Sequence, residues 1–318
     1  MRDDAPFLHL RFDRVFPDDF YAEMLLAMPV TDDYRAMSGK SKMGSSRADG
    51  KPTRTKIDLF PEYIRHLPPM KREIWDAAGR ALRSKELEKA FMQRLAPGLK
   101  RRFGVDFANV KMYPVPILTR DIPGYRIFKH TDSLWKGITV QFYLPPDNST
   151  PHIGTIFHEV LPNGRKPKKA QMPFSPNSGY AFAVADNTWH SADPVGPEVK
   201  TRDSILLTYF VDAGPWRFVR NRGRRAANFA LNELRNLKHQ LMQHRGRMSS
   251  HGAISRSFAA VNTRGTLHRT SRKRLQFNAA MVAPCSQAHT QGLRRRRNSL
   301  PILSGQFCPA CQRPCDDN

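Results

Sequence analysis

The sequence predicts an α+β protein in which N-terminal helices support a β-rich core of the sandwich, barrel or jelly-roll type. The first observation is the helical spacing of apolar residues between residues 63 and 103. The second is a series of short β-type runs between residues 107 and 211, separated by Gly, Pro, Asn and Asp. The third is that this strand pattern ends at Val211.

The N-terminal residues predict one strand followed by one helix. Residues 7–16 alternate apolar and polar side chains, as a half-buried strand does. Pro17 and the acidic residues after it start a helix that runs to Met28 and stops before Pro29. Residues 30–57 are polar and rich in Ser, Gly and Lys, so we expect a loop there.

Two further helices are predicted between residues 63 and 103, with breaks at Pro68-Pro69 and at Ala96-Pro97-Gly98. We expect them to form a buttress behind the β-rich core. The β-type runs then follow in order as residues 110–117, 125–129, 138–144, 154–160, 179–184, 188–192 and 204–211.

The C-terminal third differs in composition from the rest of the chain. Residues 224–244 carry an apolar stripe with a basic opposite face, which predicts a helix packed on the core. Residues 247–318 are rich in Ser, Arg, Asn, Gln and Thr without apolar periodicity, which predicts a basic, largely disordered tail. The expected organisation is an N-terminal strand with supporting helices, a β-rich core, a C-terminal helix and a tail, at residues 1–106, 107–215, 216–246 and 247–318.

Positive charge is concentrated near the C-terminus. The chain carries a formal net charge of +24. Residues 216–318 hold 20 Lys+Arg and 3 Asp+Glu, a net of +17, which leaves +7 for residues 1–215. A basic end of this kind suits phosphate-rich partners or anionic surfaces. Because no RNA-binding motif accompanies the Arg-rich runs, we expect at most non-specific binding of nucleic acid or an anionic surface there.

The cysteines are also confined to the C-terminal part, since all four lie at or after Cys285. The core therefore has no disulfide framework, and a reducing compartment is the simpler interpretation. No apolar signal region and no membrane-spanning run are visible, so we expect a cytoplasmic protein without a transmembrane segment. Cys308 and Cys311, with Cys315 or with Cys285 and His289, form an incomplete zinc-type pattern. We favour a loose tail over a zinc site and leave both open.

Two histidines and one aspartate form the candidate metal site. His130 and Asp132 are two residues apart in a strand-like run, so both side chains can face one ion. His190 stands at the penultimate strand pattern. Two imidazoles and one carboxylate on one face of a metal are typical of a non-haem Fe(II) site with open coordination positions. Arg202, at the start of the last strand pattern, offers the fork that holds a carboxylate with two hydrogen bonds.

These residues lie in segments that resemble the Fe(II)/2-oxoglutarate-dependent dioxygenases, and within them the prolyl-hydroxylase-like branch. The resemblance covers about residues 107–212. The segments that carry it are PGYRIFKHTD at residues 123–132, QFYLP at 141–145, GT at 154–155, WHSADPV at 189–195 and RDSILLTYFVD at 202–212.

The resemblance implies a double-stranded β-helix, or jelly roll, with Fe(II) and the co-substrate 2-oxoglutarate, and it leaves ascorbate open as a further cofactor. By position, His130, Asp132 and His190 would ligate the iron. Arg202 would bind the far carboxylate of 2-oxoglutarate. Tyr143 would donate a hydrogen bond to that carboxylate, and Ser204 would supply the hydroxyl of the Arg-x-Ser pair. We expect no catalytic residue beyond the metal ligands.

The implied function is an oxygenase that hydroxylates a small-molecule or peptide substrate and releases succinate and CO₂. The sequence does not identify the substrate, whose pocket we expect to be formed by loops at residues 30–57 and 161–178. Two alternatives stay open. One is a non-catalytic jelly-roll binding protein, although a pure binder needs neither the complete ligand set nor Arg202. The other is a nucleic-acid-associated protein that acts through its basic C-terminal region.

Overall fold

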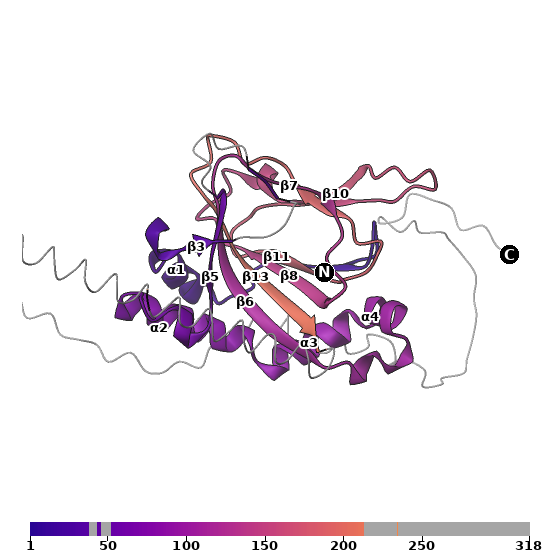
Figure 1. Ribbon diagram of the computed structural model, residues 1–318, viewed down its shortest axis with the longest axis horizontal. Helices are drawn as coiled ribbons and strands as arrows, with labels where there is room; N and C mark the ends of the chain where they lie inside the picture. Colours follow the sequence, from indigo (N-terminus) through magenta and orange to yellow (C-terminus); the bar gives the residue numbers. More distant parts are fainter. Residues whose placement is uncertain (38–42, 46–51, 213–233, 235–318) are drawn as a thin grey trace, which may run out of the picture. The chain divides into compact units, whose positions relative to one another are not determined.

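The computed structural model describes residues 1–37, 43–45, 52–212 and 234 of the chain. Within these residues, two antiparallel β-sheets face one another and helices cover the outer side of the larger sheet (Figure 1). The helices are α1 (Asp18–Leu26), α2 (Pro69–Leu82), α3 (Lys85–Arg94) and α4 (Ala96–Phe103), with 3₁₀ turns η1 (Thr31–Asp33), η2 (Pro61–Tyr63), η3 (Val105–Asn109) and η4 (Pro151–Ile153). None of them combines the length and the apolar character that a bilayer-spanning helix requires.

The strands are β1 (Arg2–Asp3), β2 (His9–Phe12), β3 (Arg35–Ala36), β4 (Met43–Ser45), β5 (Arg54–Asp58), β6 (Met112–Asp121), β7 (Tyr125–His130), β8 (Lys136–Tyr143), β9 (Thr155–His158), β10 (Lys168–Met172), β11 (Gly179–Ala183), β12 (His190–Ala192) and β13 (Arg202–Val211). The larger sheet has the order β1-β2-β11-β8-β13-β6-β5-β3, and the smaller has the order β10-β9-β12-β7-β4. Of the strands from β6 to β13, four lie side by side in each sheet, an arrangement consistent with a jelly roll.

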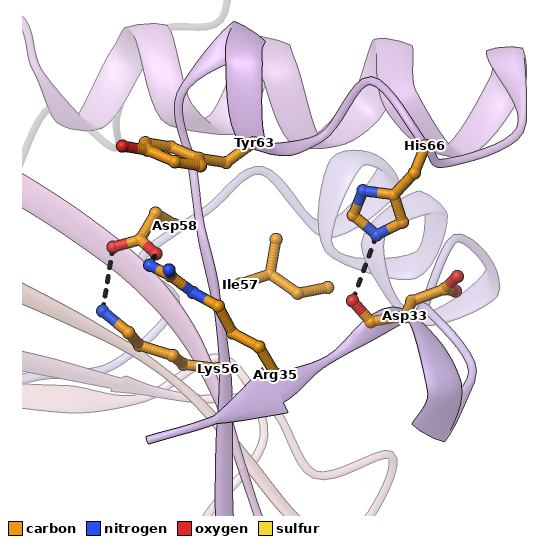
Figure 2. A pocket seen from close by; sticks show the side chains of 7 residues that line it. All are labelled: Asp33, Arg35, Lys56, Ile57, Asp58, Tyr63 and His66. Atoms are coloured by element: carbon orange, nitrogen blue, oxygen red, sulfur yellow. Dashed lines mark hydrogen bonds and ion pairs between the residues drawn. The ribbon is translucent and has the colours of Figure 1, made fainter. Parts of the chain in front are cut away.

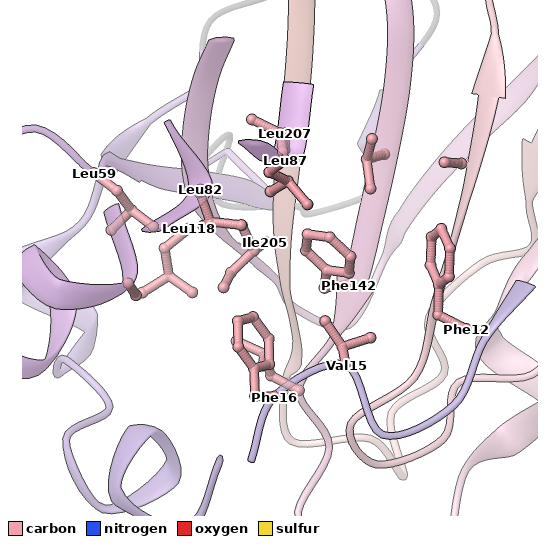
Figure 3. Close-up of a cluster of buried hydrophobic side chains, with 14 of the residues drawn as sticks. Phe12, Val15, Phe16, Leu59, Leu82, Leu87, Leu118, Phe142, Ile205 and Leu207 are labelled. Atoms are coloured by element: carbon pink, nitrogen blue, oxygen red, sulfur yellow. The ribbon is translucent and has the colours of Figure 1, made fainter. Parts of the chain in front are cut away.

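Alternation along the central strands separates two apolar cores. The outer core lies between the larger sheet and the helices, and Figure 3 shows Phe142, Ile205 and Leu207 of the sheet near Leu82 and Leu87 of the helices. The inner core lies between the two sheets and contains side chains from both. Successive residues of a strand point to opposite faces, so Phe142 faces the helices and Tyr143 faces the interior.

The helical part agrees with the sequence in extent and in two of its breaks, but it contains one further break. α1 and the start of α2 at Pro69 fall where Pro17 and Pro68-Pro69 predicted them. We expected two helices between residues 63 and 103, whereas the structure has three. The missed break is at Ser84, whose Oγ accepts a hydrogen bond from the Leu87 amide and so caps α3. The predicted break at Ala96-Pro97-Gly98 agrees with the structure to within one residue, because α3 ends at Arg94 and α4 begins at Ala96. Pro97 occupies the first turn of α4, where its missing N–H is not needed.

Two segments that we predicted as loops contain strands. Residues 30–57 include β3, β4 and the start of β5, and residues 161–178 include β10. The prediction failed because these strands are short and lie at or near sheet edges, where pairing with a neighbour rather than apolar alternation defines the strand. β5 pairs with β6, and β10 pairs with β9. The two lysines at the start of β10 are typical of an edge strand.

The predictions for the C-terminal part lie outside the described residues. They include the helix at residues 224–244, of which residue 234 alone is described, the tail at 247–318 and the zinc-type cysteines. The domain boundaries at residues 215 and 246 also fall there, and together with the boundary at residue 106 they stay predictions.

Candidate functional site

The structure brings His130, Asp132 and His190 together at one end of the interior. His130 ends β7 and His190 begins β12, and the two residues are paired across these neighbouring strands. Their ring centroids are 4.2 Å apart. Each of the three side chains offers an atom that lies within 4.8 Å of the others, and all three side chains are buried. Among the described residues, this is the group of His, Cys, Asp or Glu side chains placed to hold a metal ion.

A bulge in β7 turns His130 toward the interior. His190 pairs with His130, whereas Ala192 pairs with Ile127, so β7 has one residue more than β12 between these two pairs. Ile127 packs against the inner core. An extra residue changes the face to which the following side chain points. The bulge therefore allows Ile127 and His130, three residues apart, to face the same side of the sheet.

Both histidines have the tautomer that a metal ligand needs. Nδ1 of His130 lies 2.8 Å from the carbonyl oxygen of Phe128, and Nδ1 of His190 lies 3.0 Å from that of Thr188. A carbonyl can only accept, so each Nδ1 carries the proton and donates. This places the lone pair on Nε2, the nitrogen that can ligate a metal ion. The carbonyls also fix the orientation of the two rings, as the outer hydrogen bonds of metal-ligating histidines do.

Asp132 is held as a carboxylate by two donors. Thr139 Oγ1 donates to Oδ2 and Lys136 Nζ donates to Oδ1, each at 2.6 Å. Burial by itself would raise the pKa of Asp132, but the charge of Lys136 and the two hydrogen bonds outweigh it and hold the pKa far below its usual range. The donor set is therefore two imidazole nitrogens and an ionised carboxylate, which fits a divalent transition metal such as Fe(II).

A polar wall runs through the interior from the metal ligands. Thr139, Gln141 and Tyr143 alternate along β8 and face inward, spanning about 13 Å at the usual rise of a strand. Gln141 Nε2 donates to Ser204 Oγ at 2.9 Å. The Tyr143 hydroxyl donates to Thr155 Oγ1 at 2.9 Å. The Tyr180 hydroxyl donates to Gln141 Oε1 at 2.7 Å and lies 3.0 Å from Thr155 Oγ1. These groups make the space between the sheets polar along one line.

Arg202 lies at the far end of this wall and is 1% exposed. Its Nε donates to the Ile153 carbonyl at 2.8 Å, and its Nη1 donates to Asp121 Oδ2 at 2.8 Å. The guanidinium carbon is 5.6 Å from the ring centroids of both Tyr143 and Phe174. Burial would lower the pKa of Arg202, but the Asp121 carboxylate more than compensates and raises it. Arg202 is therefore a fixed cation on the interior side of β13.

The predicted co-substrate residues lie together at this end. Tyr143 is beside Arg202, and its hydroxyl also accepts a hydrogen bond from the Thr155 amide at 2.9 Å. Ser204 is paired across the sheet with Tyr143, and its Oγ is 2.9 Å from Thr119 Oγ1. Proximity is what the structure establishes for Arg202, Tyr143 and Ser204. Their binding of a co-substrate stays a prediction.

Several polar residues of the site were not predicted. They are Arg54, Asp121, Thr139, Gln141, Thr155 and Tyr180. Arg54 was missed because its segment was predicted as a loop. Thr139 and Gln141 could have been found from the alternation of β8, which places them on the face of Tyr143. Asp121 could not, because only the register of β6 with β13 shows that it lies opposite Arg202.

A small polar pocket lies elsewhere, against the other end of β5 (Figure 2). Its lining residues are Asp33, Arg35, Lys56, Ile57, Asp58, Tyr63 and His66. Asp58 is paired with Arg35 and with Lys56, and His66 Nε2 is 3.1 Å from the carbonyl oxygen of Asp33. These charged groups pair with one another, and the pocket contains no member of the metal triad. We therefore place the functional site in the interior between the sheets.

Comparison with known proteins gives structural similarity only. No family model and no curated protein matches the chain. Solved structures that are similar to it include a Pseudomonas putida prolyl-4-hydroxylase, with 14% identity over 64% of this chain and 91% of that chain and a TM-score of 0.38. Another is a 2OG-Fe(II) oxygenase-family oxidoreductase from Burkholderia pseudomallei, with 13% identity over 64% and 84% and a TM-score of 0.37. A third is the α-ketoglutarate-dependent epimerase SnoN of nogalamycin biosynthesis, with 12% identity over 64% and 77% and a TM-score of 0.35. Similarity at this level assigns no activity to this chain.

Proposed function

We propose that the protein is an Fe(II)- and 2-oxoglutarate-dependent oxygenase whose active site is the interior between His130 and Arg202. The observation that carries the proposal is the triad itself: two oriented imidazoles and one ionised carboxylate within 4.8 Å of one another. A triad on one face of the metal leaves coordination positions for a co-substrate and O₂. When bound, iron and 2-oxoglutarate supply oxidative chemistry in which the keto acid is converted to succinate and CO₂.

The residues of this chain bind, orient and shield. His130, Asp132 and His190 would hold the iron, and Thr139 would keep the Asp132 carboxylate in its orientation. Arg202 would hold the far carboxylate of 2-oxoglutarate at the other end of the polar wall. Aromatic residues of the inner core, such as Phe182 at 5.2 Å from the His190 ring, would limit the access of water to the metal.

The proposed reaction is hydroxylation of a small-molecule or peptide substrate. The surface next to the metal ligands supports a substrate site, because exposed apolar side chains lie close to them in the chain. Phe128, Leu134 and Trp135 are 49%, 66% and 52% exposed. Trp189, next to His190, makes a cation–π contact with Lys166, whose Nζ lies 4.2 Å from the ring centroid. A cytoplasmic location stays a prediction from the cysteine distribution.

A non-catalytic binding protein is the second candidate, and one observation favours it. Lys136 occupies Oδ1 of Asp132, so a metal must share this carboxylate with Lys136 or displace it. A protein without a metal would keep this ion pair permanently. Metal binding to the full chain, measured by titration with Fe(II) under exclusion of O₂, separates the two candidates.

The test of function is a turnover assay without added substrate. We expect the full-length protein to convert 2-oxoglutarate to succinate slowly when Fe(II) and O₂ are present, and Asp132→Ala to be inactive. Candidate acceptors are then screened for faster turnover. Succinate formation that is equal in the parent and in Asp132→Ala would contradict the proposal. Deletion of residues 247–318 tests the nucleic-acid alternative, because unchanged turnover would make that region accessory.

A further inference from the structure

Asp121 is shared by two buried guanidinium groups. Arg54, at the start of β5, donates from Nε to Oδ1 at 2.5 Å and from Nη2 to Oδ2 at 2.7 Å. Arg202, at the start of β13, donates from Nη1 to Oδ2 at 2.8 Å. The Asp121 side chain is 0% exposed, and the Arg54 side chain is 11% exposed. Both arginines are thus hydrogen-bonded to one carboxylate, that of the last residue of β6.

The register of three adjacent strands explains this arrangement. β6 lies between β5 and β13, and Asp121 is the residue opposite both Arg54 and Arg202. The Arg54 guanidinium carbon also lies 4.3 Å from the ring centroid of Tyr125, which keeps the side chain in the interior. Burial alone would lower the pKa of Arg54, but Asp121 raises it above its usual value. Both arginines are therefore cationic.

The charges of this cluster do not cancel. Arg202 with Asp121 alone would form a neutral pair, which has little attraction for an anion. Arg54 supplies the second positive charge, so two guanidinium groups and one carboxylate leave one net positive charge. A desolvated site of that charge is complementary to a carboxylate.

We infer that Arg54 is a positioning residue for the dicarboxylate co-substrate, because it neutralises Asp121 and leaves the charge of Arg202 for the co-substrate. Asp121 in turn fixes the orientation of the Arg202 fork. This inference rests on the proposed function. It adds a residue from β5, a strand that begins inside the segment predicted as a loop, to the co-substrate end of the site.

The neighbouring residues on the same strands provide a matched control. Arg120 precedes Asp121 on β6, Asp203 follows Arg202 on β13, and Arg120 and Asp203 are paired across the two strands. Because successive residues of a strand point to opposite faces, these two side chains lie on the helix side. Arg120 Nε donates to Asp203 Oδ1 at 2.7 Å, and both side chains are 9% exposed. Arg120→Gln therefore removes a buried arginine from an Asp on the same two strands without touching the interior charge.

The experiment measures the Kd of 2-oxoglutarate by titration of the full-length, Mn(II)-loaded protein, together with its Mn(II) affinity and its Tm. We expect Arg54→Gln to raise this Kd roughly 30-fold, the effect of one unit charge at roughly 8 Å with an effective dielectric constant of about 20. Arg54→Lys, which keeps the charge, is expected to stay much closer to the parent. Arg120→Gln should lower Tm while leaving the Kd unchanged.

A charge-balanced double variant separates charge from packing. Arg54→Gln with Asp121→Asn leaves Arg202 as the one charge of the cluster, so the net charge is again that of the parent. We expect the Kd to return most of the way to the parental value. The inference is overturned if Arg54→Gln binds 2-oxoglutarate like the parent, or if the double variant binds as weakly as Arg54→Gln. A parent protein that binds Mn(II) but shows no 2-oxoglutarate binding would instead contradict the proposed function.

Discussion

The two faces of the β6–β13 pair carry similar residues in different electrostatic arrangements. On the helix side, Arg120 and Asp203 pair one to one, with Thr201 Oγ1 donating to Asp203 at 2.7 Å and the Arg120 guanidinium over the Tyr34 ring at 4.6 Å. The charges of Arg120 and Asp203 therefore balance each other within this pair. On the interior side, two guanidinium groups share one carboxylate, so the cluster has one net positive charge. The helix-side pair is balanced in charge, whereas the interior cluster has a surplus positive charge that is complementary to an anion.

The same difference separates the polar groups along the two faces. The interior side of β8 carries Thr139, Gln141 and Tyr143, whereas the helix side carries Ile138, Val140 and Phe142. Burying hydroxyl and amide groups costs stability unless they are hydrogen-bonded. The interior face of β8 is polar and its helix-side face is apolar, which indicates that the interior face serves a function other than packing.

The largest effect is expected at the metal triad. Asp132→Ala and His190→Ala each remove one of three ligands, so Fe(II) binding should be lost at concentrations that saturate the parent. The matched control is His158→Gln, since His158 is a buried histidine of the same sheet whose Nε2 pairs with Ser191 Oγ at 2.8 Å. Metal analysis of purified proteins checks this. Unchanged iron occupancy in both ligand variants would remove the basis of the proposal.

The next largest effect is expected at Arg202. Arg202→Ala should weaken 2-oxoglutarate binding by about 2–5 kcal/mol if the charge pair is desolvated. Arg202→Lys should weaken it less, because a point charge replaces the fork. Arg120→Ala on the other face should cost about 3–5 kcal/mol of folding stability, as removal of one partner of a buried pair does. It should leave 2-oxoglutarate affinity intact. Similar affinity losses in Arg202→Ala and Arg120→Ala would break the distinction between the two faces.

A smaller effect is expected at Thr139. Thr139→Val removes the hydrogen bond to Asp132 Oδ2 and nearly preserves side-chain volume. Loss of an outer hydrogen bond of this kind typically weakens metal binding about 10- to 100-fold. Thr119→Val, which removes a buried hydroxyl that contacts Ser204 instead, serves as the control. Metal titrations of both variants should differ; equal affinities would show that Thr139 does not orient the carboxylate.

The smallest effect is expected at Tyr143. Tyr143→Phe should weaken 2-oxoglutarate binding by about 1 kcal/mol, because one hydrogen bond is lost while the charge cluster remains. Tyr209→Phe on the helix side is the comparison, since the buried Tyr209 hydroxyl has no hydrogen-bond partner among the described residues. We expect no change in co-substrate affinity there. A Tyr143→Phe variant that binds like the parent would place the Tyr143 hydroxyl outside the co-substrate site.

The comparison also explains which parts of the site the sequence could predict. His130 and Asp132 are a local pattern in one strand, and His190 and Arg202 begin later strands, so periodicity and residue type were sufficient to select them. The structure brings the first three together, although their role as ligands is still to be measured. Arg54 and Asp121 depend on the register among three strands that are distant in the sequence. No local pattern carries that information, and the polar composition of residues 30–57 indicated a loop.

The fold shows the same division. The strands from β6 to β13 were predicted wherever apolar runs were bounded by turn residues, and they agree with the structure to within a few residues, as at β8 and β13. The strands that were missed, such as β10, lie at or near sheet edges and are short or polar. They exist because a neighbouring strand supplies their hydrogen bonds, which is a property of the assembled sheet.

The measurement that tests the account most directly is a 2-oxoglutarate titration of the full-length protein with and without Fe(II), under exclusion of O₂. If the interior holds the metal at one end and the far carboxylate at the other, binding should be saturable and much tighter with Fe(II) than without it. The dependence should vanish in Asp132→Ala. Absence of binding with Fe(II), or equal affinity with and without the metal, would contradict a shared interior site.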